Sequence, residues 1–128
     1  MRLLLDTHAF LWAIADDKRL STKARRAIED TRNDVNFSVV SAWEIIAKTS
    51  VGRLTLSESA DKMIPKHIAA SGFSVLGLTL THALATATLP LHHRDPFDRM
   101  LVAQALTEDL TVVSGDEAIG KYDVKVMW

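Results

Sequence analysis

Short apolar runs alternate along the chain with longer stretches in which apolar residues recur at the spacing of a helix. Each run is rich in leucine, β-branched or aromatic residues and is followed by polar positions, as expected for buried strands. We predict strands at residues 3–5, 35–40, 73–76, 110–113 and 124–127.

The stretches between these runs carry the residues that begin and end helices. Asp95-Pro96 is a typical start, because aspartate caps free N–H groups and proline fits the first helical position. Ser41 and Glu44 have the spacing of a capping box. Pro65 is expected to kink or restart its helix. The predicted helices cover residues 8–15, 21–30, 42–51, 57 or 59 to 70, 81–88 and 95–108.

The order of these elements defines the fold class. Strands that alternate with helices form βαβ units, which build a parallel sheet covered by helices on both faces. We therefore expect an α/β fold, a three-layer α/β/α sandwich with a mainly parallel central sheet. Neither a linker nor an internal repeat is visible, so residues 1–128 are expected to form one domain.

Composition narrows the classes of protein. The chain has 128 residues, of which 48% are hydrophobic, enough for one core. The absence of cysteine excludes disulfides and thiolate metal sites. No apolar run is long enough to span a bilayer, and Asp6 interrupts any signal-peptide core, so we expect a soluble cytoplasmic protein without a membrane partner. A net charge of −1 gives no overall attraction for nucleic acid, so any such binding needs local basic patches.

Four acidic residues occupy similar places relative to the predicted elements. Asp6 and Asp116 follow strands, and Glu44 and Asp98 stand near the starts of helices. In an open parallel sheet these ends of strands and helices meet at one crevice, where ligands bind. Crowded carboxylates repel one another unless a hard cation such as Mg²⁺ or Mn²⁺ neutralises them. Such a cation activates water toward phosphodiesters, so the pattern favours a metal-assisted phosphodiesterase.

Each acid also has a purely structural interpretation. Glu44 can complete the capping box, and Asp98 can interact with the dipole of its helix. Asp116 can be a turn residue, and Asp95 is more readily a cap than a ligand. Asp6 is the hardest to explain in this way, because it directly follows an apolar strand and needs a partner.

Four segments resemble the motifs of PIN domains. They are Leu4-Leu5-Asp6-Thr7-His8, Val40-Ser41-Ala42-Trp43-Glu44-Ile45, the run from Asp95 to Ala105, and Val112-Val113-Ser114-Gly115-Asp116. They follow one another in the family's order and cover the chain from residue 4 to residue 116. The second and third segments most resemble the toxin branch of type II toxin–antitoxin systems, the VapC-like proteins.

The resemblance implies a Mg²⁺- or Mn²⁺-dependent endoribonuclease. In this interpretation Asp6, Glu44 and Asp98 hold the principal metal, and Asp116, favoured over Glu117, supports a second or weaker site. Thr7 and Ser114 match positions that hydrogen-bond near the metal or the scissile phosphate. Asp95 is then a cap or supports the ligands from behind. His93 and Arg94, with His92, could contact the RNA backbone, although a solvated loop is the favoured interpretation.

The resemblance also implies partners. Toxins of this branch form homodimers and are silenced by a small antitoxin, whose tail lies in a groove and places a basic side chain near the acids. The RNA target is not evident from the sequence.

The remaining chemistry-bearing residues have no pattern of their own. His8, His67 and His82 lack metal-ligand spacing and are expected on the surface or on helix faces. Trp43 is expected in the core rather than as a stacking platform for bases. Lys48 and Arg53 are candidates for RNA or partner contact, or simply solvated charges.

Two other functions stay open. Aspartyl-phosphate enzymes of the haloacid-dehalogenase or receiver type also place acids at strand ends, although His8 stands where such phosphatases have a second aspartate. A non-catalytic PIN-like binding module would keep the fold and use the acids only as surface charge.

Overall fold

The computed structural model describes residues 1–128 and contains one parallel sheet with the strand order β3-β2-β1-β4-β5. The strands are β1 (Arg2–Leu5), β2 (Asp34–Ser38), β3 (Ser74–Leu76), β4 (Thr111–Val113) and β5 (Val126–Met127). The chain builds the sheet outward from β1 to β3 and then returns to the other side of β1. This reversal creates a switch point between β1 and β4, where the connections diverge and leave a crevice.

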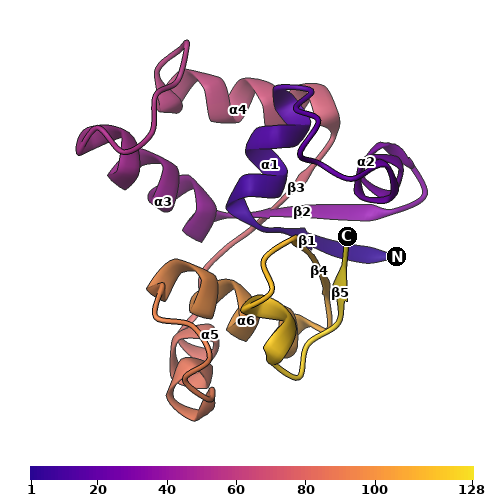
Figure 1. Ribbon diagram of the computed structural model, residues 1–128. Helices are drawn as coiled ribbons and strands as arrows, with labels where there is room; N and C mark the ends of the chain where they lie inside the picture. Colours follow the sequence, from indigo (N-terminus) through magenta and orange to yellow (C-terminus); the bar gives the residue numbers. More distant parts are fainter.

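Helices cover both faces of the sheet (Figure 1). The first face carries α1 (Thr7–Ile14), α2 (Thr22–Glu29), α3 (Val39–Ser50) and α4 (Ala60–Ser71). The second face carries α5 (Leu80–Ala85) and α6 (Pro96–Glu108), with the short 3₁₀ turns η1 (Thr86–Thr88) and η2 (Ile119–Lys121). The α/β/α sandwich and the parallel sheet expected from the sequence are thereby confirmed. No helix is both long enough and apolar enough to cross a membrane.

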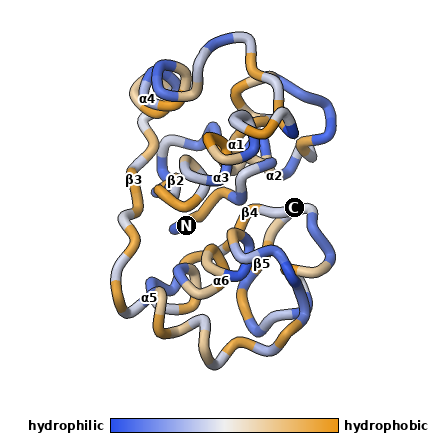
Figure 2. The backbone as a smooth tube through the Cα atoms, turned by 90° about the vertical axis from the view of Figure 1, so that its left-hand side faces the viewer, coloured by the Kyte–Doolittle hydropathy of each residue, from blue (hydrophilic) through white to orange (hydrophobic).

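The alternation of side chains along β1 divides the core in two. Leu3 and Leu5 pack with Phe10 and Phe37 beneath the helices of the first face. Leu4 points the other way and packs with residues of α6. In Figure 2 the hydrophilic stretches lie mainly in the connections between elements. Because β1 is apolar on both faces, the polar residues that follow it mark the edge of the core.

The start of α3 differs from the prediction. Ser38, the last residue of β2, is the N-cap and its hydroxyl accepts the N–H of Val40 at 3.0 Å. The strand therefore ends at Ser38 rather than residue 40, and the helix begins three residues before the expected position at 42. Glu44 lies in the second helical turn, so the predicted capping box with Ser41 is wrong. A side-chain cap at the strand end outweighs the strand preference of Val39 and Val40.

Pro65 does not divide its helix, because α4 runs through it without a restart. Pro65 is exposed, so the carbonyl that loses its N–H partner can be solvated. His82, expected on the surface or on a helix face, lies on α5 and is fully buried. Its ring Nδ1 accepts the N–H of Thr79, and its Nε2 lies 3.0 Å from Oε1 of Glu108.

Candidate metal and active site

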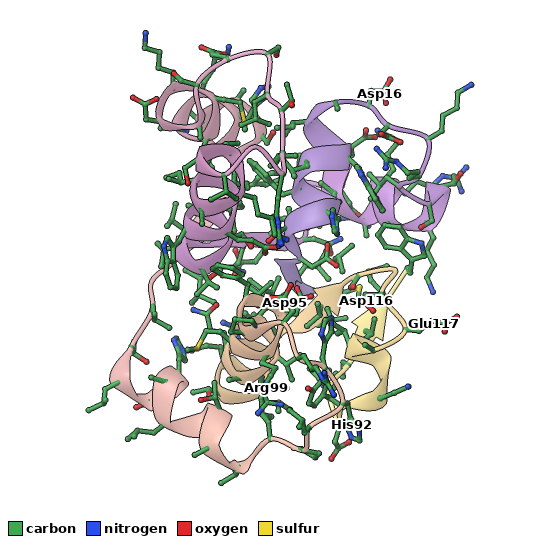
Figure 3. All side chains as sticks on the ribbon, turned by 60° about the vertical axis from the view of Figure 1, so that its left-hand side comes forward. Asp16, His92, Asp95, Arg99, Asp116 and Glu117 are labelled. Carbon is green, nitrogen blue, oxygen red and sulfur yellow. The ribbon has the colours of Figure 1, made fainter.

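Acidic residues gather at the carboxyl ends of β1 and β4, at the switch point of the sheet. Asp6 follows β1, Asp116 lies beyond β4, and Asp98 stands in the first turn of α6. Figure 3 shows Asp95 and Asp116 where the helices of the first face meet α6 and β4, whereas Asp16 lies at the far end of the molecule. The topology thus brings together acids that are far apart in the sequence.

Asp6 is buried and serves as the N-cap of α1. Its Oδ1 accepts the N–H of Ala9 at 2.7 Å. Burial raises the pKa of the Asp6 carboxyl, an effect that outweighs the lowering by the hydroxyl of Ser114 and the N–H of Ala9. The negative charge of Asp116 also raises it. The structural role of Asp6 therefore leaves it under electrostatic strain that a nearby cation would relieve.

Glu44 is held by residues from two helices. Thr7 Oγ1 forms hydrogen bonds with Oε1 of Glu44 at 2.5 Å and with the hydroxyl of Ser41 at 2.9 Å. Oε2 of Glu44 pairs with the ammonium of Lys48, one turn further along α3. Glu44 is 2% exposed, so these contacts fix its carboxylate at the edge of the core. Thr7, expected near the metal, therefore acts on a predicted metal ligand.

Asp98 is the most perturbed acid of the site. Burial raises its pKa to about 7, and the negative charges of Asp95 and Glu44 add to the rise. Asp6 contributes in the same direction, whereas His93 opposes it. Asp95 is the N-cap of α6, as expected, and its Oδ1 accepts the N–H groups of Phe97 and Asp98. The raised pKa of Asp98 therefore reflects first its burial and then the repulsion from Asp95, Glu44 and Asp6.

His93 lies between two of the acids. Its Nε2 is 3.0 Å from Oδ2 of Asp98 and 3.1 Å from Oδ2 of Asp116. The N–H of Asp95 donates to Nδ1 of the ring at 3.0 Å, so the proton of a neutral imidazole lies on Nε2 and faces the carboxylates. The sequence suggested His93 for RNA contact and gave no sign of this position, which depends on contacts across 23 residues.

The loop that carries His93 is fixed by a basic side chain from α6. The guanidinium of Arg99 donates to the carbonyl of Pro90 at 2.8 Å and to the hydroxyl of Tyr122 at 3.1 Å. The same hydroxyl accepts the backbone N–H of His93 at 3.0 Å. Arg99 and Tyr122 were not among the residues singled out from the sequence.

The structure separates the two candidate acids after β4. Asp116 faces His93, and its backbone N–H donates to the hydroxyl of Ser114 at 3.0 Å. Glu117 points outward from the site in Figure 3. The preference for Asp116 over Glu117 therefore agrees with the directions of the side chains.

The donor set fits a hard divalent cation. A ring nitrogen of His93 and a carboxylate oxygen from each of Asp98 and Asp116 lie within 4.8 Å of one another, and the two acids supply the metal donors because the proton of the ring faces them. The carboxylates of Asp6 and Glu44 are close enough to raise the pKa of Asp98. Oxygen donors in this number, with at most one imidazole and no thiol, match the preference of Mg²⁺ or Mn²⁺. The residues present therefore suit the metal that the sequence suggested.

Several predicted residues lie outside this cluster. Arg94 is exposed, and His92 packs edge-on against Tyr122 with ring centroids 5.0 Å apart. Trp43 is 64% exposed and lies against Phe97, so its expected place in the core is wrong. The reason is its position on α3, where adjacent Glu44 takes the inward-facing side of the helix.

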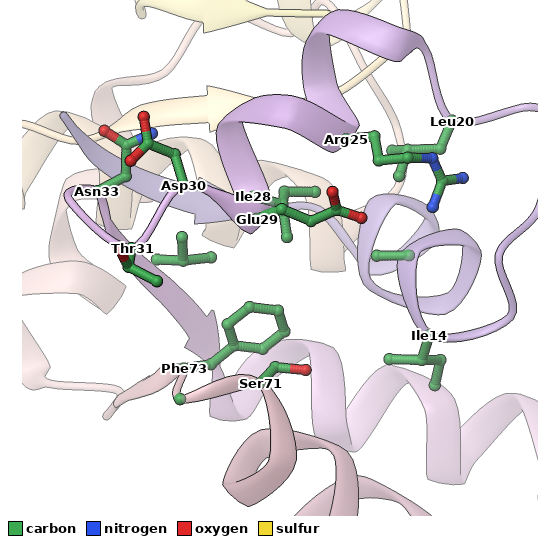
Figure 4. A pocket seen from close by; sticks show the side chains of 13 residues that line it. Ile14, Leu20, Arg25, Ile28, Glu29, Asp30, Thr31, Asn33, Ser71 and Phe73 are labelled. Atoms are coloured by element: carbon green, nitrogen blue, oxygen red, sulfur yellow. The ribbon is translucent and has the colours of Figure 1, made fainter.

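A separate cavity of about 390 Å³ lies at the opposite end of the sheet (Figure 4). It is lined by Ile14, Leu20, Ile28 and Phe73, among others, near the amino ends of β2 and β3. None of the four clustered acids lines it. This cavity, whose lining also includes Arg25, Glu29 and Asp30, is therefore separate from the acids at the carboxyl ends of the strands.

The chain belongs to the PIN domain family, whose sequence profile matches residues 3–125. The family resemblance seen in the sequence is thus confirmed. No curated protein matches the chain. The comparisons give no support to an aspartyl-phosphate enzyme.

Solved structures with the same fold come from bacterial complexes. VapBC2 from Rickettsia felis, bound to a DNA fragment from its promoter, has a TM-score of 0.73 at 13% identity and covers 99% of this chain and 98% of its own. VapBC-1 from nontypeable Haemophilus influenzae has a TM-score of 0.65 at 15% identity, with 99% and 97% covered. FitAcB from Neisseria gonorrhoeae has a TM-score of 0.60 at 18% identity, with 98% and 96% covered. At these identities the similarity establishes the fold.

Proposed function

We propose that the protein is a metal-dependent endoribonuclease, one PIN domain over residues 1–128, that acts as the toxin of a toxin–antitoxin pair. The observation that carries the proposal is the convergence of Asp6, Glu44, Asp98 and Asp116 at the switch point of a PIN fold, with the pKa of Asp98 raised to about 7. Acids whose pKa is raised by burial and by one another are typical of functional sites.

Asp6, Glu44 and Asp98 would hold the principal Mg²⁺ or Mn²⁺, and Asp116 would hold a weaker one. When bound, such a metal lowers the pKa of water and stabilises the negative charge that develops on the phosphodiester. Thr7 keeps the carboxylate of Glu44 oriented, and the hydroxyl of Ser114 does the same for Asp6 and for the backbone at Asp116. His93 holds Asp98 and Asp116 near one another.

A basic hollow beside the acids supports RNA as the substrate. It is lined by Thr7, His8, Leu11, Glu44, Ile45, Lys48, Arg53 and Leu54 and has a volume of about 430 Å³. Arg53 supplies local positive charge that the net charge of the chain does not, and Lys48, paired with Glu44, offsets the one acid of the lining. We assign the phosphate backbone to this hollow, and Arg94, exposed beyond the acids, to an outer phosphate.

The fold of the VapBC and FitAcB complexes supports a cognate antitoxin as partner. Large apolar side chains exposed on α3 and α5 are candidates for a surface that a second copy of the chain would cover. They include Trp43, Ile46, Leu80 and Leu84. We expect the pair to act in the cytosol, where RNA is available.

The test is cleavage of total bacterial RNA by purified wild type, Asp6→Asn, Asp116→Asn and Glu117→Gln, each with Mg²⁺, Mn²⁺ or EDTA. Glu117→Gln is the matched control for Asp116→Asn, since it removes the neighbouring charge that points away from the site. We expect discrete, metal-dependent fragments from wild type and Glu117→Gln. Asp6→Asn should lose activity, and Asp116→Asn should need more metal.

Equal activity in wild type and Asp6→Asn would contradict the proposal and indicate a contaminant. A phosphorylated Asp6, trapped after incubation with a phosphate donor, would replace it with aspartyl-phosphate chemistry. Failure to bind any divalent cation, measured by calorimetry, would favour the non-catalytic binding module.

A further inference from the structure

A second hollow opens on the other side of the acids, and its walls are aromatic. It has a volume of about 410 Å³, within the range of small-ligand pockets. It is lined by Asp6, His8, Trp12, Arg19, Gly115, Asp116 and Trp128. Two predicted metal ligands therefore form one wall of a space whose other walls come from α1, the loop after it and the end of the chain.

The rings of this hollow form a connected set. His8 stacks on Trp12 with centroids 5.3 Å apart and an interplanar angle of 22°. Trp12 contacts Trp128 with centroids 5.8 Å apart, and the guanidinium of Arg19 lies 4.8 Å from the centroid of Trp12. Arg19 is itself paired with Asp17. Asp17 therefore compensates the charge of Arg19, and the guanidinium contributes mainly a planar surface to the lining of the hollow.

Trp128 is fixed directly beside the acids. A Cβ added to Gly115 would lie 2.7 Å from Cε2 of the Trp128 ring, closer than any real contact. The indole therefore packs on the backbone of the residue that precedes Asp116. Because Gly115 has no side chain, the ring of Trp128 can reach the site. No pattern in the sequence predicts this contact.

We propose that this hollow binds one base of the single-stranded RNA next to the scissile phosphate, an inference that rests on the proposed nuclease function. The only cation of the lining, Arg19, is paired with Asp17, so the aromatic end of the hollow offers no unpaired positive charge to a phosphate. The base is the uncharged, planar part of a nucleotide and matches indole and imidazole surfaces. Stacking tolerates any base, so the hollow orients the strand while Lys48 and Arg53 contact its backbone on the other side.

The test measures binding apart from cleavage. An Asp98→Asn background removes a predicted metal ligand that does not line the hollow. The probe is a short oligoadenylate RNA labelled for anisotropy, with a series in which each position in turn is abasic. The variants are Trp12→Leu and Trp128→Leu, with Trp12→Phe and Trp128→Phe to keep a flat ring. Leu106→Ala is the control, because Leu106 is an apolar side chain exposed on α6 outside the hollow.

We expect each leucine variant to bind the intact probe about 5-fold to 150-fold more weakly, the range for losing one stacked base. The phenylalanine variants should retain most of the affinity, and Leu106→Ala all of it. One abasic position should weaken the binding of the protein with both tryptophans by the same factor. With the probe that lacks this base, the leucine substitutions should cause almost no further loss of affinity. Circular dichroism identifies variants that do not fold. If a leucine variant does not fold, the phenylalanine variants and the abasic series test the inference without it.

Equal affinity for all abasic probes, or leucine variants that bind like wild type, would overturn the inference. If wild type nevertheless cleaves RNA, the nuclease function stands. If the stacking results hold but no metal-dependent cleavage is found, the hollow is a base-binding site and the nuclease function fails.

Discussion

Nε2 of His93 lies 3.0 Å from Oδ2 of Asp98, and the same nitrogen reaches Asp116. Because Nδ1 of the ring accepts a backbone N–H, His93 presents a donor to both carboxylates. Replacing His93 by alanine should release Asp116, which is on an exposed loop, from Asp98. We expect the Mg²⁺ concentration for half-maximal cleavage to rise about 10-fold or more, the usual effect of losing a group that orients metal ligands.

His93→Gln should restore part of the metal affinity, because a glutamine amide places a donor near the position of Nε2. The maximal rate at saturating Mg²⁺ should change little in either variant. An unchanged metal requirement in His93→Ala would show that the histidine does not orient the acids.

The raised pKa of Asp98 should make the metal-free protein less stable as the pH rises. The pKa is about 7 in the folded chain against an ordinary value of 3.8. The stabilising contribution is therefore complete below about pH 3.8 and is lost as the pH rises through 7. In EDTA at pH 8, Asp98→Asn should be more stable than wild type by up to about 4 kcal/mol.

Urea unfolding of both proteins at pH 5 and pH 8 measures this difference. Saturating Mg²⁺ should stabilise wild type at pH 8 and have much less effect on Asp98→Asn, because ligand binding favours the folded state. The same stability difference at both pH values would contradict the assignment.

The contrast between α6 and α3 shows which parts of the fold are readable from the sequence. Asp95-Pro96 is a local signal, and α6 begins at Pro96 as predicted. For α3, Ser38 and Ser41 are both plausible caps, and choosing between them requires knowledge of where β2 leaves the sheet. Local chemistry predicts an element's existence, whereas its boundary depends on tertiary contacts.

The candidate site shows the same division. The four acids can be proposed from the sequence because strand and helix ends converge in any parallel sheet. His93 and Trp128 could not be placed, since each reaches the acids through a loop or a chain end whose path no periodicity describes. The exposure of Trp43 could not be predicted either, because the sequence does not show which side of α3 faces the sheet.

A buried polar network should contribute measurably to stability. Oε1 of Gln104 accepts the hydroxyl proton of Ser38 at 2.5 Å, and its amide donates to the carbonyl of Gly77 at 3.3 Å. Gln104→Met would leave the hydroxyl proton of buried Ser38 without its acceptor, whereas the carbonyl of Gly77, an exposed residue, can be solvated. We expect a loss of about 1 to 3 kcal/mol in the free energy of unfolding, measured in urea. Thr107→Met, exposed on the same helix, is the control, and an equal effect of both would exclude the network as the cause.

Arg99 should position His93 from a distance. Its guanidinium contacts Pro90 and the Tyr122 hydroxyl, which in turn accepts the N–H of His93. A lysine carries one compact donor group and cannot reproduce this fork. In Arg99→Lys we expect faster hydrogen exchange at the amide of His93 and a higher Mg²⁺ requirement, with a stability loss of about 1 to 3 kcal/mol. Arg94→Lys, exposed on the same loop, should leave the exchange rate unchanged. If His93 stays equally protected in Arg99→Lys, the loop is held by its other contacts and the metal requirement should also stay that of wild type.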